Sequence, residues 1–265
     1  MRDMLVQGIG ICAAGLPDWQ SASPALRDAT PFEPGMAIDR AVDSLPATER
    51  RRINETSRLA CLAAADALAA LPSGAAATAA AVFTSAEGDG AVLAQLLKAL
   101  AQRDIALSPT AFHNSVYNAP AGYWTIASQS CAPTTTMCAD RESFAMALLE
   151  AYAQALAGMA PVLVIAVDAP FPEVIRTLGA SAAPFACALV LDVGEGSKAG
   201  RSIGGWRMCD RARAQNRDDL IATAYGGNAA AAALPLLRAL AAPEAARVQL
   251  PYLDGLALEL EVGPE

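Results

Sequence analysis

The chain has 265 residues, of which 54% are apolar, 17% charged and 5% aromatic. This apolar fraction is ample for a buried core, which excludes a disordered chain. The formal net charge is −8, and because a negative chain repels phosphate backbones we expect no nucleic-acid partner. No stretch reaches about 18 uninterrupted apolar residues, so we expect no membrane span.

The six cysteines are scattered and form no CxxC pair. We interpret them as reduced core thiols, and the first residues lack the layout of a signal peptide, so we expect a cytoplasmic protein. His113 is the single histidine. With one histidine in total and no CxxC pair, we expect no zinc or other metal site, and we also expect no cofactor. The cysteines are Cys12, Cys61, Cys131, Cys138, Cys187 and Cys209.

The first half of the chain contains two predicted strands and two predicted helices. Met4–Cys12 is a short β-rich run that predicts the first strand, and residues 18–48, which contain Pro, Ser and Asp, predict a surface loop. Apolar residues at helical spacing predict a helix over Asn54–Leu71. Thr78–Ser85 then predicts a buried strand, and Gly90–Leu100 the next helix.

Further along, a helix is predicted to begin near Asn118, followed by a β-branched strand at Thr134–Cys138 and a long helix at Ala139–Ala157. Pro161–Val167 and Phe185–Val193 are nearly uninterrupted apolar strands, as expected where both faces of a sheet are covered. Strands that alternate with helices indicate βαβ units. We therefore expect an α/β fold with a mostly parallel, five-stranded sheet and buried Ala-rich helices.

The last seventy or so residues differ in composition. Residues 194–217 mix glycines with arginines that are interleaved with aspartates, which indicates a solvated face or, alternatively, a docking surface for an acidic protein. An Ala-rich helix at Ala229–Ala241 and a strand at Leu256–Val262 follow. We expect residues 1–193 to form one domain and residues 194–265 a short extension that packs on it. The arginines are Arg201, Arg207, Arg211, Arg213 and Arg217.

Cys138 and His113 are the candidates for nucleophilic chemistry. Cys138 lies close to a turn between a strand and a helix, where the positive helix N-terminus lowers the pKa of a thiol, and His113 is the one histidine that could serve as its base. The alternative is that Cys138 packs as a small hydrophobe and that His113 bonds to backbone groups. Ser115, Asp140 and Glu142 could be joined to His113 in a Ser–His–Asp arrangement, but no GxSxG turn supports it.

The order of motifs resembles the N-terminal half of a β-ketoacyl synthase, a family with the thiolase fold. LVQGIGICAAGL resembles the first strand of that family, and Arg58-Leu59-Ala60 its second landmark. Residues 112–126, FHNSVYNAPAGYWTI, are similar to the helix with an Asn-x-x-Ala-Gly pattern, and most similar to the short chain-length-factor-like branch. The resemblance implies a half-thiolase fold over about residues 4–193.

The nucleophile position departs from the synthase pattern. In synthases the cysteine follows the proline of a Gly-Pro pair by eight residues and precedes a helix alanine by ten. Counts from Pro133 and from Ala151 both give Arg141, whose protonated guanidinium cannot attack a thioester. The synthases also use two histidines from a C-terminal half, and no histidine follows His113. The resemblance thus implies no independent catalysis, with Cys138 and His113 as weak candidates.

The resemblance further implies a heterodimer with a full-length β-ketoacyl synthase, which elongates fatty-acid, polyketide or aryl-polyene chains on acyl carrier protein. The pair would associate through the strand before the nucleophile turn, and aromatic residues would line the interface or acyl tunnel, with core packing as the competing interpretation. A Cys138-dependent acyltransferase or thioesterase and a homodimeric acyl-binding module are the alternatives. The implied interface or tunnel residues are Tyr117, Tyr123, Trp124, Thr134, Thr135 and Thr136.

Overall fold

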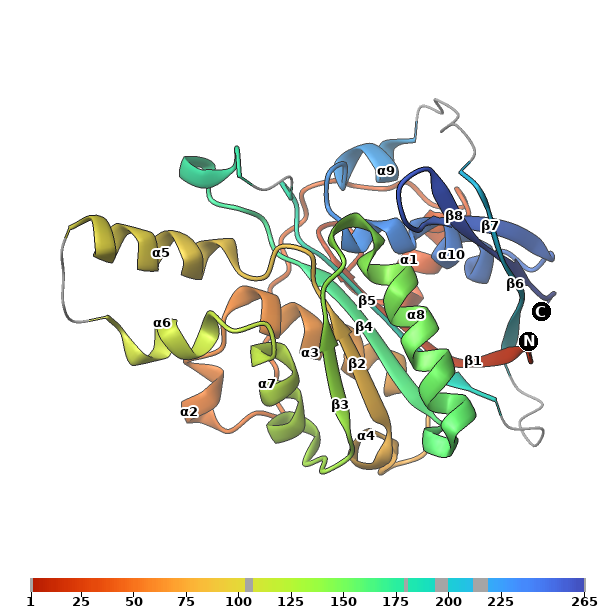
Figure 1. The fold of residues 1–265 in the computed structure, drawn as a ribbon, viewed down its shortest axis with the longest axis horizontal. Coiled ribbons are helices and arrows are strands. Elements are labelled where there is room, and N and C mark those ends of the chain that lie inside the picture. Colours follow the sequence, from red (N-terminus) through yellow and green to blue (C-terminus); the bar gives the residue numbers. More distant parts are fainter. Residues whose placement is uncertain (1, 103–106, 179–180, 194–199, 212–218, 265) are drawn as a thin grey trace.

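The structure is a computed structural model that describes residues 2–102, 107–178, 181–193, 200–211 and 219–264. Within them, eight strands form one sheet in the order β3-β2-β4-β5-β1-β6-β8-β7, with helices on both faces (Figure 1). The strands are β1 (Met4–Ala13), β2 (Ala80–Thr84), β3 (Thr134–Met137), β4 (Val162–Asp168), β5 (Phe185–Asp192), β6 (Arg201–Asp210), β7 (Ala246–Pro251) and β8 (Leu256–Val262). The main helices are α1 (Trp19–Leu26), α3 (Glu55–Leu68), α5 (Gly90–Ala101), α6 (Pro109–Asn114), α7 (Ala119–Ser128), α8 (Ser143–Gln154), α9 (Leu220–Ala224) and α10 (Leu234–Ala241).

The sheet is mixed. Strands β3, β2 and β4 are parallel to one another, whereas every other neighbouring pair among the described strands is antiparallel. The α/β class is confirmed, but the expected mostly parallel sheet of five strands is wrong in both direction and number. An apolar run that is covered on both faces has the same pattern whichever way its neighbour runs, so the sequence could not reveal the direction.

Alternate residues of the central strands divide the core into two clusters. In β4, Val162 and Val164 face the cluster that contains α8, α1 and α10, whereas Leu163, Ile165 and Val167 face the cluster that contains α3 and α7. The side chains of a strand point to opposite faces at successive residues. Burial on both faces therefore explains why β4 is apolar at every position up to its last residue.

Helix α3 packs unusually closely on β1. A Cβ atom on Gly8 or Gly10 would overlap the carbonyl oxygen of Ala67 or Ala63, so the two glycines allow the helix backbone to approach the strand. This close approach accounts for the two glycines of the Gly-Ile-Gly sequence. It also explains why α3 has the small residues Ala63 and Ala67 where it meets β1.

Several elements differ from the predicted ones. The segment expected to be a loop at 18–48 contains α1, which Asp18 caps by accepting a hydrogen bond from Ser21 N at 2.8 Å. Helix α6 precedes α7 and carries His113, which was expected in a loop. The long helix expected at 139–157 begins as a 3₁₀ turn, Asp140–Glu142 (η1), and its α-helical part is α8.

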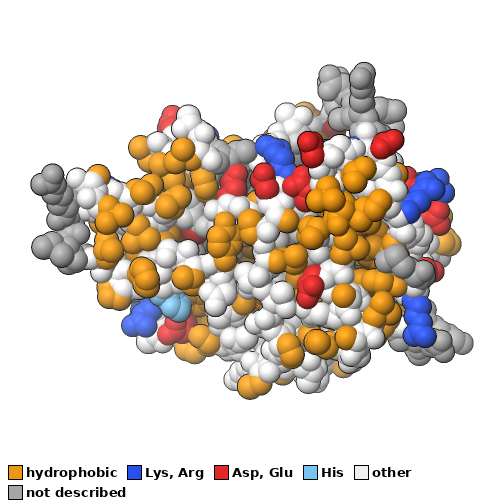
Figure 2. Space-filling view, viewed as in Figure 1, with side chains coloured by type: hydrophobic (Ala, Val, Ile, Leu, Met, Phe, Trp, Pro, Cys, Tyr) orange, Lys and Arg blue, Asp and Glu red, His pale blue; other side chains and the backbone are white. Residues whose placement is uncertain are grey.

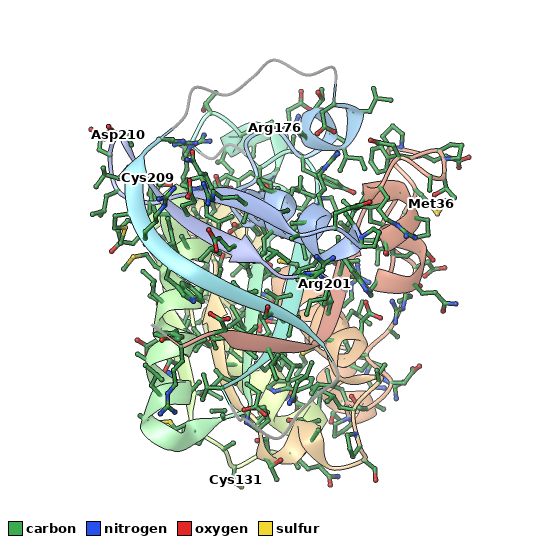
Figure 3. The ribbon with its side chains drawn as sticks, turned by 90° about the vertical axis from the view of Figure 1, so that its right-hand side faces the viewer. Met36, Cys131, Arg176, Arg201, Cys209 and Asp210 are labelled. Atoms are coloured by element: carbon green, nitrogen blue, oxygen red, sulfur yellow. The ribbon has the colours of Figure 1, made fainter. Side chains whose placement is uncertain are left out.

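The last part of the chain extends the same sheet through β6, β8 and β7, and the division at residue 193 stays a prediction. Figure 3 shows β6 crossing this side of the molecule between Arg201 and Asp210. Arg201 is buried, and its guanidinium donates to the carbonyl oxygens of Ala239 and Glu244 at 3.0 and 2.7 Å. The expectation of a solvated arginine face is therefore wrong for Arg201. Arg213 and Arg217 lie outside the described residues.

The six cysteines are all free thiols, and they differ in how far they are buried. Cys12, Cys61 and Cys187 are buried as expected, and burial raises the pKa of each thiol to about 12. Cys131 and Cys138 are exposed, so the interpretation of core thiols is wrong for these two. Among the described residues, no helix is long and apolar enough to cross a bilayer.

Candidate functional site

The three parallel strands β2, β3 and β4 have their carboxyl ends on the same side of the sheet. Their carboxyl ends bring together Ser85 after β2, Cys138 after β3 and Asp168 at the end of β4. In open α/β sheets, ligands bind outside the carboxyl ends of parallel strands. The region around these carboxyl ends is therefore the candidate site.

Asp168 is the centre of a buried hydrogen-bond cluster. Its Oδ1 accepts from Ser85 Oγ at 2.7 Å, from Ala86 N at 3.0 Å and from Glu87 N at 3.1 Å, while Oδ2 accepts from Ala230 N at 3.0 Å. Burial raises the pKa of this carboxyl from 3.8 to about 6, against the lowering effect of the Ser85 hydrogen bond. The cluster fixes the loop after β2 to the end of β4. The sequence analysis did not single out Asp168, although an aspartate at the end of a wholly apolar strand was a usable signal.

Asn228 joins the C-terminal part of the chain to this cluster. Its buried amide nitrogen lies 3.0 Å from the carbonyl oxygen of Asp168 and 2.8 Å from Ser181 Oγ. Its Oδ1 accepts from Ala230 N at 3.0 Å. Residues far apart in the sequence are thus held together at the carboxyl ends of the parallel strands.

The turn after β3 is held by two buried hydroxyl groups. Ser143 Oγ accepts from Ala139 N at 3.0 Å and donates to the carbonyl oxygen of Asp140 at 2.6 Å. Thr84 Oγ1 donates to the carbonyl oxygen of Met137 at 3.1 Å. At the tip, Asp140 has φ of 46°, a conformation that is uncommon for non-glycine residues and needs support from its surroundings. The exposed Arg141 follows it directly.

Cys138 and His113 have different neighbours. The Sγ atom of Cys138 lies 3.5 Å from the carbonyl oxygen of Ala86 and 4.0 Å from the hydroxyl of Tyr117. The His113 ring packs edge-on against Tyr123, with ring centroids 5.8 Å apart. Over the described part of the chain, no contact joins Cys138 to His113 or gives the thiol another base.

The other combinations have no support in the geometry. Ser115 Oγ donates to the carbonyl oxygen of Phe112 at 2.7 Å, which is a local turn bond. Asp140 and Glu142 lie in the 3₁₀ turn ahead of α8. Within the described ranges, His, Cys, Asp and Glu side chains form no group of three that could hold a metal ion.

The aromatic candidates divide between core and surface. Tyr123 and Trp124 are buried in the cluster around α3, and the Tyr123 hydroxyl donates to Asn114 Oδ1 at 3.0 Å. Both side chains are therefore buried in this chain, and a role for them in an interface or acyl tunnel stays a prediction. Tyr117 is half exposed and lines a cavity of about 200 Å³ together with Ser85 and Glu87. Burial and the nearby Cys138 raise the pKa of its hydroxyl.

Strand β3 is one of the two edges of the sheet, and its outer side has no neighbour among the described strands. Ala81 N donates to the carbonyl oxygen of Pro133, so odd-numbered residues bond to β2 and the backbone groups of Thr134 and Thr136 face outward. The Thr135 hydroxyl accepts from Gln154 Nε2 at 2.9 Å. The strand carries no charged residue.

Helix α5 projects from the body of the molecule with α6 (Figure 1). Leu93, Leu97 and Leu100 lie one turn apart along it, and each is at least 39% exposed. Phe112 on α6 is 64% exposed, and Figure 2 shows hydrophobic side chains gathered over this lobe. Exposed apolar surfaces of this kind occur at protein- or membrane-interaction sites and in ligand-binding grooves.

Residues 18–250 match the family model for the N-terminal domain of β-ketoacyl synthases. No curated protein matches the chain. A chain of the complex between ketosynthase ApeO and chain length factor ApeC from Xenorhabdus doucetiae is 21% identical, with a TM-score of 0.73 over 98% of this chain and 99% of that one.

Two further solved structures have the same fold. The ishigamide ketosynthase/chain length factor has a TM-score of 0.75 at 13% identity, covering 98% of this chain and 99% of that chain. A β-ketoacyl synthase from Burkholderia phymatum STM815 has a TM-score of 0.71 at 14% identity, with both chains covered completely. The fold is therefore thiolase-like.

Proposed function

Because the chain belongs to the β-ketoacyl synthase N-terminal domain family, we propose that it is the chain-length-factor-like subunit of a heterodimer with a full-length β-ketoacyl synthase. The observation that carries this proposal is the open β3 edge, which lies in the same half of the chain as the exposed leucine stripe of α5. A subunit with unpaired outward backbone groups and exposed leucines is stabilised by a partner that covers them. The Xenorhabdus and ishigamide structures contain a ketosynthase with its chain length factor, which supports the same arrangement here.

Catalytic silence is the second part of the proposal. Asp140 and Arg141 lie at the tip of the turn after β3, and neither side chain carries a thiol that could serve as the nucleophile. The sole histidine of the chain packs on Tyr123, away from the contacts of Cys138. In this proposal the partner supplies the condensation chemistry in the cytoplasm. This chain stabilises the partner and shapes the tunnel for acyl, polyketide or aryl-polyene chains delivered by acyl carrier protein.

Affinity purification of the tagged chain from its own source tests the pairing, with mass-spectrometric identification and stoichiometry. The proposal predicts a full-length ketosynthase at a 1:1 ratio. Recovery of the chain as a symmetric homodimer that binds acyl chains would support the homodimeric acyl-binding module instead. Recovery as a monomer would contradict both.

A second candidate function rests on the exposure of Cys138 beside the Tyr117 hydroxyl. A Cys138-dependent acyltransferase or thioesterase would form a covalent thioester when the purified chain is incubated with an acyl thioester. Intact-mass spectra would show an acyl adduct that Cys138→Ala abolishes and Cys131→Ala, the matched exposed cysteine, retains. The proposed role predicts no adduct, and no condensation of acyl and malonyl thioesters by this chain alone.

A further inference from the structure

A cavity of about 530 Å³ lies beside the turn after β3, between α9, the start of α10 and β7. Its charged lining residues are Arg141 from η1, Arg211 after β6, Asp219 before α9 and Arg238 from α10. The rest of its wall is mostly apolar, and its accessible apolar side chains include Ala222, Ala231, Ala232 and Pro235. The volume is that of a site for a small organic ligand.

The charges in this cavity are not balanced. Asp219 Oδ1 lies 2.7 Å from Arg238 Nη2 and also caps α9 by accepting from Ala222 N at 3.0 Å. That ion pair compensates Arg238. Arg141 and Arg211 make no side-chain hydrogen bond or ion pair with any other described residue, and both are exposed to the solvent at the cavity. Among the described lining residues, three arginines and one aspartate thus give an excess of positive charge, although the whole chain has a net charge of −8.

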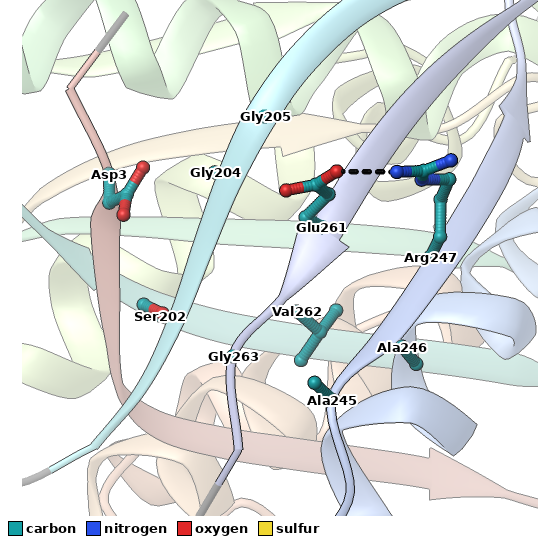
Figure 4. Close-up of a pocket in the computed structure, with 10 residues that line it drawn as sticks. All are labelled: Asp3, Ser202, Gly204, Gly205, Ala245, Ala246, Arg247, Glu261, Val262 and Gly263. Atoms are coloured by element: carbon teal, nitrogen blue, oxygen red, sulfur yellow. Dashed lines mark hydrogen bonds and ion pairs between the residues drawn. The ribbon is translucent and has the colours of Figure 1, made fainter.

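A second cavity provides a contrast. It measures about 410 Å³ and lies between the start of β1 and the strands β6, β8 and β7 (Figure 4). Its one arginine, Arg247, donates to Glu261 Oε1 at 2.8 Å, and Asp3 faces the same space. Its walls are largely backbone around Gly204, Gly205 and Gly263, which leaves neither an uncompensated cation nor an apolar floor.

We infer that the cavity beside Arg141 binds an organic anion with an apolar body, a carboxylate or phosphate monoester on a short alkyl chain. A guanidinium presents a planar pair of donors that matches carboxylate and phosphate oxygens. Arg141 and Arg211 would bind the anionic group, and the accessible alanines and Pro235 would cover the alkyl chain. The binding is reversible and forms no covalent bond.

This inference concerns the chain's own cavity and does not depend on the proposed pairing. Binding is measured by calorimetric titration of the full-length purified chain, whereas pairing is measured by copurification, so either can fail alone. The probes are octanoate, octyl phosphate and octylamine. We expect one or both anions to bind and octylamine not to bind, and the stronger anion identifies the head group.

Two arginine variants and one filling variant locate the binding. Because Arg141 and Arg211 are exposed and make no side-chain hydrogen bond among the described residues, Arg141→Gln and Arg211→Gln should fold normally and weaken anion binding about tenfold each. Ala232→Leu should weaken binding of the octyl probes by occupying the apolar wall. Arg51→Gln removes an exposed arginine outside the cavity and should leave binding unchanged.

Three results would overturn the inference. One is the absence of binding by either anion to the unsubstituted chain. Another is binding that Arg141→Gln, Arg211→Gln and Ala232→Leu all leave unchanged while circular dichroism shows folded proteins. The third is octylamine binding as tightly as octanoate, because an apolar surface without charge selection would then suffice.

Discussion

The two edges of the sheet are built in opposite ways. Strand β3 consists of three threonines and a methionine, with outward backbone groups that have no partner among the described residues. Strand β7 at the other edge carries Arg247, which pairs with Glu259 and Glu261 of β8, and ends at Pro251. Charges and proline at an edge prevent unwanted strand pairing.

The difference indicates which edge meets a partner. Strand β7 has features that keep other strands away, and the Glu259 carboxylate beside it is bound by Arg207, Arg247 and Gln249, which lowers its pKa. Strand β3 has none of these features, and its end and the following turn are held by the Thr84 and Ser143 hydroxyl groups. A rigid strand with an unprotected edge is suited to pairing.

The largest expected effect comes from blocking the β3 edge. Thr136→Pro removes an outward N–H and places a ring at the edge, so copurification of the ketosynthase should be lost, with affinity down more than about 100-fold. Thr136→Val keeps the N–H and is the matched control. Normal pairing by a folded Thr136→Pro variant would show that β3 is not the interface strand.

Asp168→Ala tests the buried cluster that fixes the loop after β2 to the end of β4. The change leaves the buried N–H of Ala230 and the N–H groups of Ala86 and Glu87 without their acceptor. We expect a loss of about 3 kcal/mol in the free energy of unfolding, measured by urea denaturation. A loss below about 1 kcal/mol would mean that water replaces the carboxylate and that the cluster does not fix the loop after β2.

The same carboxyl predicts a pH dependence. Folded Asp168 keeps its proton up to a pKa of about 6, whereas the unfolded group releases it near 3.8, so the folded state binds more protons between these values. The contribution of Asp168 to stability therefore falls as pH rises from about 4 to 6, by at most about 3 kcal/mol. Denaturation at several pH values should show this fall in wild type relative to Asp168→Asn. A constant difference would contradict the raised pKa.

Leu97→Asp tests whether the leucine stripe of α5 extends the interface. A charge in an apolar contact should weaken pairing with the ketosynthase about 10- to 100-fold without changing the unfolding midpoint, because Leu97 is exposed in the free chain. Gln95 is also exposed, and helical geometry places it on the opposite side of α5, so Gln95→Asp introduces the same charge away from the stripe and serves as the control. Equal weakening by both variants would exclude a specific role of the stripe.

The smallest effect is expected at the closed edge. Arg247→Gln removes the ion pairs to Glu259 and Glu261. The Arg247 side chain is largely exposed, so solvent screens both pairs. The thermal midpoint should fall slightly at low ionic strength, and the difference should disappear at about 1 M salt. Pairing should be unaffected. A loss of pairing here would reverse the assignment of the two edges.

Local patterns predicted much of the fold. Strands β1, β4 and β5 are apolar runs because they are buried in the sheet. Helix α3 has apolar residues at helical spacing because it is buried along its length. Strands β6 and β7 were missed because glycines, arginines and a short alternating pattern gave no clear period. Strand direction was beyond reach, since it depends on which distant segments pair.

The candidate site was predictable only where its residues follow one another in the sequence. The turn around Cys138 and Arg141 lies in one short segment, so its position could be counted. The Asp168 cluster and the arginine cavity join residues separated by about 60 to 100 positions. No spacing rule connects such residues, and their association depends on the sheet order.

Amide hydrogen exchange of the chain, free and with the copurified ketosynthase, tests the central claim most directly. The β3 amides, above all those of Thr134 and Thr136, should exchange readily in the free chain and become protected in the complex. The β7 amides of residues 246–250 should exchange at the same rate in both states. Protection that appears at β7, or a β3 edge that stays unprotected in a stable complex, would contradict the claim that β3 is the pairing edge.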